Sequence, residues 1–197
     1  MAIIDEKEFA RIREGMDAFD AKRETIIKES RDILKLSKQA IYSIHRGDLK
    51  AAEQGLKDAA SLKAKLEKAI AGDQGLRTGG FSNALEEYVE AKTFLSFVTK
   101  KRIATMKELA VQPDEYLLGL SDLTGELMRR AVMSATKRDV AEVQRIKECL
   151  DLLYGQFVTF DFRNGELRRK YDSIKYNLQK VENTLYDLSL SRRTEED

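Results

Sequence analysis

The fold is decided by residues 113–134, PDEYLLGLSDLTGELMRRAVMS. In this stretch the apolar residues recur every three or four positions on one side, at Leu117, Leu120, Leu123, Leu127 and Ala131. That spacing is typical of an amphipathic helix. Pro113 suits the first turn of a helix, where a missing backbone N–H costs nothing. We therefore expect a helix from Pro113 to about Ser134.

The segments before this helix show the same spacing. It predicts a long first helix over about 8–44 and a second over 49–70, separated by Gly47 and Asp48. Glycine favours the left-handed end of a helix and aspartate the N-cap of the next, so the two should form a helical hairpin. Four of the eleven glycines lie between residues 72 and 80, which marks a loop before a third helix over 81–98. A brief connection should then end before Pro113.

The segments after it are also helical in pattern. Thr136, followed by Asp139, predicts the capped start of a helix that runs through Val158. A last helix should begin at Leu167, and its apolar residues alternate by three and four without a break up to Leu188. Such an alternation predicts a seam against another helix or another subunit.

Composition agrees with an all-α chain. Of 197 residues, 35% are charged and only one is Pro, which is typical of long solvated helices. We expect a single-domain bundle of six or seven helices over residues 1–191 and a mobile tail over 192–197. The net charge of +1 provides no whole-molecule attraction for nucleic acid, so any such binding must use local patches.

Several features bear on location. The single cysteine, Cys149, cannot form an internal disulfide and lies in a helical pattern, so we interpret it as a core residue. The N-terminus shows no long apolar run of a secretory signal, and no stretch approaches the ~18 apolar residues of a membrane span. We expect a cytoplasmic protein without membrane contact.

Two pairs of carboxylates stand out in the middle of the chain. Glu87 and Glu90 are three residues apart and extend an apolar helix face, and no Lys or Arg lies three or four residues from either. Asp122 and Glu126 are four apart on the next long helix. Gly119, one turn before Asp122, leaves room for a neighbouring helix, a water or a ligand.

The two pairs suggest a metal site if their helices pack side by side. Four carboxylates and no histidine favour Mg²⁺ or Mn²⁺ over zinc or di-iron. A solvated acidic face is the alternative, and for Glu126 a local ion pair with Arg129 or Arg130 is another. Spacing by itself leaves these alternatives open.

Two strings around these acids carry a resemblance to a known family. EEYVEA at 86–91 and YLLGLSDLTGELMR at 116–129 resemble the signature segments of the Trax branch of the translin family. Residues 30–32, 44–46 and 180–183 are similar to flanking family segments, so the resemblance covers most of the chain. The translin branch has non-acidic residues where this chain has Glu87 and Glu90, which favours the nuclease branch. The chain is shorter between the third and fourth long helices than animal Trax proteins, as expected of a compact, prokaryotic version.

The resemblance implies a function. It implies a translin-like seven-helix bundle that assembles into an octamer-like barrel and cuts RNA at an Mg²⁺-dependent carboxylate site facing the cavity. Glu87, Glu90 and Asp122 are implied as catalytic metal ligands, with Glu126 as a fourth. Self-assembly is expected, and a translin-type partner is compatible but not required. The alternative is a non-catalytic scaffold that binds RNA or single-stranded DNA.

Scattered cations are the candidate RNA contacts. Arg31, Lys35 and Lys38 share a face of the first helix, and Arg77 lies in the loop before the third. A solvated charged face accounts for the first three equally well. Two basic runs have explanations other than RNA binding. The run at 100–102 suits the C-terminal end of the third helix, where positive charge is favourable. The run at 168–170 is interleaved with acids. The only histidine, His45, is expected to cap or pack.

Overall fold

The computed structural model describes residues 3–162 and 165–196, without the side chains of residues 74 and 191–196. Within these residues the chain forms seven α-helices, one short 3₁₀ helix and no strand. The helices are α1 (Glu6–Arg46), α2 (Leu49–Ile70), α3 (Gly79–Lys100), α4 (Met106–Leu109), α5 (Pro113–Ala135), α6 (Val140–Val158) and α7 (Glu166–Glu196), and the 3₁₀ helix is η1 (Gln74–Leu76). The predicted all-α bundle is confirmed.

The expected hairpin of the first two helices is present. Gly47 has φ 80°, and its N–H donates to the carbonyl of Ile44 at 3.1 Å, which ends α1. The Asp48 carboxylate accepts from the N–H of Ala51 at 3.1 Å and begins α2. Both caps satisfy backbone groups that a helix end leaves unpaired. The Gly-Asp pair therefore reverses the chain as predicted.

One local prediction was wrong. Thr136 does not begin α6: it has helical φ and ψ (−62°, −22°) at the C-terminal end of α5. The chain turns at Arg138, which has φ 57°, and Asp139 is the N-cap, accepting from the N–H of Glu142 at 3.1 Å. The predicted connection before Pro113 is present, and it contains an additional helical turn, α4, closed by a capping box between Thr105 and Glu108.

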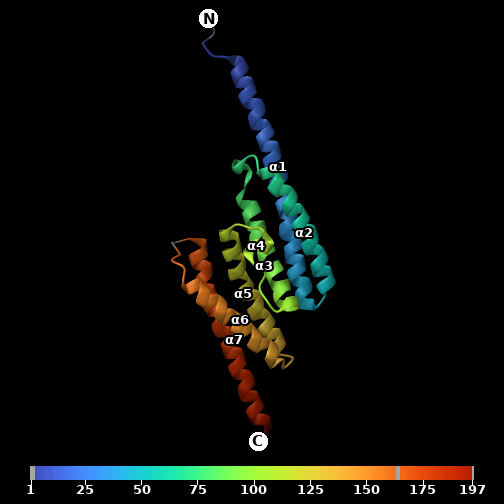
Figure 1. The fold of residues 1–197 in the computed structure, drawn as a ribbon, viewed down its shortest axis with the longest axis vertical. Coiled ribbons are helices and arrows are strands. Elements are labelled where there is room, and N and C mark those ends of the chain that lie inside the picture. Colours follow the sequence, from blue (N-terminus) through green and yellow to red (C-terminus); the bar gives the residue numbers. More distant parts are fainter. Residues whose placement is uncertain (1–2, 163–164, 197) are drawn as a thin grey trace.

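The helices pack in a chain of neighbours that places α3 and α5 in the middle. α1 packs against α2 and α3, α3 packs against α5, and α5 packs against α6 and α7. Figure 1 shows the N-terminal part of α1 and the C-terminal part of α7 extending from opposite ends of this bundle. The seam predicted for the last helix is partly internal, since Ile174, Leu178 and Val181 are buried in the core.

Gly119 is where α5 comes closest to α3. A Cβ atom at this position would lie 2.6 Å from the carbonyl oxygen of Glu86 and 2.6 Å from Cβ of Val89. Of the three uses expected for the missing side chain, the structure shows the first, the approach of a neighbouring helix. Because α3 carries Glu87 and Glu90, this contact sets the distance between the two acidic pairs.

Three remaining predictions concern the C-terminal tail, Cys149 and membrane contact. α7 continues to Glu196. The mobile tail predicted over 192–197 stays a prediction, because these side chains and the whole of residue 197 lie outside the described part of the chain. Cys149 is partly buried and packs against the core, and burial raises the pKa of its thiol to about 11. Within the described residues, no helix is both long and apolar enough to cross a membrane.

Candidate carboxylate site

The packing of α3 on α5 brings both acidic pairs to one region. Glu90 is the most buried of the four acids, with 7% of its surface exposed. Burial raises its pKa to about 9, and the charges of Glu87, Asp122 and Glu126 contribute to that rise. Carboxylates influence one another in this way only when they are close, because the repulsion falls with distance. The other three acids are therefore near enough to Glu90 to interact with it electrostatically.

Glu87 stands at the edge of this space beside α1. Its carboxylate lies 3.8 Å from the ammonium nitrogen of Lys38. Burial raises the pKa of Glu87, Lys38 opposes that rise, and Asp122 and Glu126 add to it. No Lys or Arg lies three or four residues from Glu87 in the sequence, and α1 supplies a cationic partner for it through space.

Glu126 is held by a histidine, contrary to the expectation that none joins the acids. Nε2 of His45, at the end of α1, lies 2.5 Å from Oε2 of Glu126, and Arg129 lies 3.7 Å away. The hydrogen bond with His45 is the main reason why the pKa of Glu126 is lowered. Arg130, the other expected partner, pairs with Glu142 instead, at 2.6 Å.

His45 is itself buried. Its side chain is 4% exposed, its ring packs at a centroid distance of 4.9 Å from Phe94, and its Nδ1 has no hydrogen-bond partner among the described residues. The residue packs, as expected, and it also orients a carboxylate, which was not expected.

Lys170 of α7 is a second residue that the sequence interpretation missed. Its ammonium lies 2.7 Å from Oδ2 of Asp122 and 3.3 Å from Oε2 of Glu86. Glu86 is buried, and burial raises its pKa while Lys170 lowers it. The only sequence signal for Lys170 was its place in a basic run interleaved with acids, which is typical of a solvated surface.

The candidate RNA-binding cations have different surroundings. Arg31, Lys35 and Lys38 are exposed on α1, and Lys38 joins this row to the carboxylate site through Glu87. Arg77 is largely buried: it forms an ion pair with Glu115, and its guanidinium lies 5.2 Å from the ring centre of Phe81. Arg77 therefore connects the loop to α5. Its role in RNA binding stays a prediction, and this buried position disfavours it.

The donor chemistry of the site fits a hard divalent cation. α3 and α5 each contribute two carboxylates to this region, and Glu90 forms no ion pair among the described residues. However, no group of three or more His, Cys, Asp or Glu residues in the described part is arranged to hold a metal ion. Binding such an ion would thus require the carboxylates to rearrange.

Comparisons with known proteins agree with this architecture. A profile of the translin family matches residues 21–192. An uncharacterized protein of Methanocaldococcus jannaschii is 34% identical over 82% of this chain and 74% of its own length. Translin-associated protein X of Rattus norvegicus is 27% identical over 92% of this chain and 77% of its own.

Solved structures are similar over almost the whole chain. The crystal structure of AfC3PO has a TM-score of 0.85 and 27% identity, with 94% of this chain and 98% of that chain covered. The structure of AfC3PO in complex with duplex RNA has a TM-score of 0.81 and 26% identity, with the same coverage. The helices, their packing and the family match lead to one conclusion: the chain belongs to the translin family.

Proposed function

We propose that this protein is an Mg²⁺-dependent endoribonuclease that hydrolyses RNA phosphodiesters at the Glu87, Glu90, Asp122 and Glu126 site. One observation carries the proposal: Glu90 is buried among three other carboxylates, with its pKa raised to about 9. Burial beside other carboxylates makes the ionised form of Glu90 costly and keeps it protonated at neutral pH, and a fold selected only for stability has little reason to keep a buried acid there. A divalent cation would offset that cost.

The chain's own residues would orient the oxygen donors. His45 holds Glu126 ionised and directed and Lys38 holds Glu87, while Lys170 occupies Asp122 and would have to give way to the ion. When bound, Mg²⁺ would supply an activated water and neutralise charge on the phosphodiester; Mn²⁺ has similar ligand preferences. Glu90, without an ion-pair partner among the described residues, is the residue most free to change its interactions on binding.

The exposed row Arg31, Lys35 and Lys38 supports an RNA path that leads to the acids. Lys38 touches the edge of the site at Glu87, so a backbone bound along this face of α1 would bring its phosphates toward the carboxylates. One similar solved structure is described as a complex with duplex RNA. We therefore include duplex as well as single-stranded RNA as substrates, with single-stranded DNA as a further ligand.

Self-assembly into a barrel is part of the proposal. The N-terminal part of α1 protrudes from the bundle (Figure 1). It exposes an apolar row three and four residues apart, with Phe9 56%, Ile12 50% and Met16 63% exposed. Large exposed apolar patches are typical of interaction surfaces. Light scattering on the Ile12→Asp variant tests this part, since a smaller particle is expected and an unchanged mass contradicts it.

The test of catalysis uses Glu90→Gln, which keeps the shape of the side chain but cannot ionise to bind a cation. With labelled single-stranded and duplex RNA and Mg²⁺, the wild type should cleave, and both EDTA and Glu90→Gln should stop cleavage. Glu24→Gln removes a carboxylate from an exposed part of α1 and should cleave as the wild type does. Cleavage by Glu90→Gln at the wild-type rate would refute the assignment.

A non-catalytic RNA-binding scaffold is the second candidate function. It is favoured by the existing partners of the acids, because Lys38, His45 and Lys170 already satisfy three of the four carboxylates. RNA binding without cleavage at any Mg²⁺ or Mn²⁺ concentration would support it. In either case the cytoplasmic location expected from the sequence stays a prediction.

A further inference from the structure

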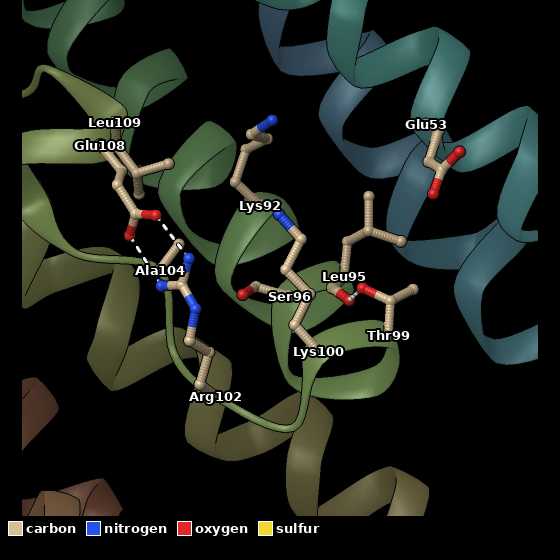
Figure 2. Close-up of a pocket in the computed structure, with 10 residues that line it drawn as sticks. All are labelled: Glu53, Lys92, Leu95, Ser96, Thr99, Lys100, Arg102, Ala104, Glu108 and Leu109. Atoms are coloured by element: carbon tan, nitrogen blue, oxygen red, sulfur yellow. Dashed lines mark hydrogen bonds and ion pairs between the residues drawn. The ribbon is translucent and has the colours of Figure 1, made fainter.

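A polar cavity lies away from the carboxylate site. It has a volume of about 380 Å³ and lies beside the C-terminal half of α3, with residues 102–109 on one side and Glu53 of α2 on the other (Figure 2). Leu95, Ala104 and Leu109 give it apolar walls. A small organic molecule fits a cavity of this size, since ligand pockets are commonly ~300–1,000 Å³.

This cavity and the carboxylate site lie on opposite faces of α3. Ser96 lines the cavity and follows Glu87 by nine residues in the sequence. At about 100° per residue, nine residues amount to two and a half turns, so the two side chains point in opposite directions. The cavity is thus a separate feature.

Two lysines give the cavity its charge. Lys92 and Lys100 both line it, and in Figure 2 the side chain of Lys100 extends toward Lys92. Neither forms an ion pair among the described residues, whereas Arg102 is neutralised by two hydrogen bonds to Glu108, at 2.8 and 2.5 Å. Burial lowers the pKa of Lys92, the charge of Lys100 lowers it further, and Glu53 opposes this fall. An anion between these two lysines would relieve their repulsion.

A buried hydroxyl in the cavity wall lacks a partner. Ser96 is 7% exposed, and its Oγ forms no hydrogen bond in the described residues. Its neighbours behave differently: Thr93 and Thr99 donate to the carbonyls of Val89 and Leu95, at 2.6 and 2.8 Å. An unsatisfied buried hydroxyl is costly, and a ligand oxygen in the cavity would satisfy it.

We propose that this cavity binds a phosphate monoester, with Lys92, Lys100 and Ser96 as donors to its oxygens. A phosphate monoester carries close to two negative charges at neutral pH and several acceptor oxygens, which two ammonium groups and a hydroxyl complement. The apolar walls would contact the organic part of the molecule. The same group occurs on a free mononucleotide and on the phosphorylated end of an RNA strand.

The test is calorimetric titration of the full-length protein in EDTA, which keeps metal binding out of the measurement. The probes are adenosine monophosphate, inorganic phosphate, and one oligoribonucleotide with either a terminal phosphate or a terminal hydroxyl. Lys92→Met and Ser96→Ala should each bind the phosphate monoester about tenfold more weakly. Lys57→Met removes one exposed lysine from α2 and should bind as the wild type does. Ser96→Ala loses no hydrogen bond, so it should melt no lower than the wild type.

The outcomes separate this site from the proposed nuclease site. Glu90→Gln should bind the monoester normally even if it does not cleave RNA, and monoester binding should persist even if the wild type proves inactive. Binding of the mononucleotide identifies a free nucleotide as the source, and binding only of the phosphorylated strand identifies the strand end. Equal affinities for the wild type, Lys92→Met and Ser96→Ala, or no binding of any probe, would overturn the proposal.

Discussion

Replacing Gly119 by Ala tests how the two acidic helices are held. The new methyl group would lie 2.6 Å from both the Glu86 carbonyl oxygen and Cβ of Val89, so α3 must move until the contacts reach at least 3.4 Å. Overpacking of a core costs ~1–3 kcal/mol, and a clash with backbone belongs at the upper end. Alanine recovers about 1 kcal/mol through its better helix propensity. The free energy of unfolding should therefore fall by about 2 kcal/mol.

Thermal unfolding followed by circular dichroism measures this loss. For a chain of this size ~2 kcal/mol corresponds to a fall in Tm of roughly 4–8 °C, at a fixed protein concentration. Gly125→Ala is the matched control on the same helix, because its methyl group would meet only the amide nitrogen of Asn177 at 3.9 Å. Gly125→Ala should raise Tm slightly.

The same substitution also tests the site. A shift of α3 moves Glu90 relative to Asp122, and misplacing catalytic groups by ~1 Å can cost about 100-fold in rate. Gly119→Ala should therefore lose RNA cleavage even at temperatures where it is folded. If Gly119→Ala melts at or above the Gly125→Ala temperature, the close approach of α5 to α3 is refuted, and with it the role of Gly119 in setting the distance between the acidic pairs.

Three further predictions concern other contacts. Lys170→Met should bind Mg²⁺ several-fold more tightly by calorimetry, because its ammonium occupies Oδ2 of Asp122 at 2.7 Å; unchanged affinity would mean that the lysine does not compete. Asp139→Ala removes the N-cap of α6 and should lower the free energy of unfolding by about 1 kcal/mol in urea titrations, whereas no change would place the cap elsewhere. The hydrogen bond from Arg102 holds the pKa of Glu108 below its usual 4.5. The stability that this contact contributes is therefore fully present above pH 4.5 and is lost as the pH falls. Glu108→Gln should accordingly show a shallower loss of stability on acidification than the wild type, and identical profiles would argue against this contact.

Helix positions could be predicted well from the sequence. The first helix was expected over about 8–44 and spans Glu6–Arg46, and the third was expected over 81–98 and spans Gly79–Lys100. Helical periodicity and caps depend on residues a few positions apart, so they are visible in the sequence. α4 was missed because four residues are too few to show a period, and Thr136 was mistaken for a cap because nothing in composition marks the turn at Arg138.

Only one partner of the acids, Arg129, could be predicted in this way, because it lies three residues from Glu126. Lys38, His45 and Lys170 are far in the sequence from the carboxylates they contact, and no local spacing connects them. The sequence likewise offered three uses for Gly119, and only the packing of α3 on α5 selected one.

The sequence by itself determined that the chain is helical, that Glu87 and Glu90 share one face and Asp122 and Glu126 another, and that it resembles the translin family. Helical geometry repeats every 3.6 residues, so these relations follow from spacing. Only the tertiary structure decided that Glu90 is buried near other carboxylates, with a raised pKa, while its neighbours have cationic partners. Burial and charge act through space rather than along the chain, and they depend on how the helices pack.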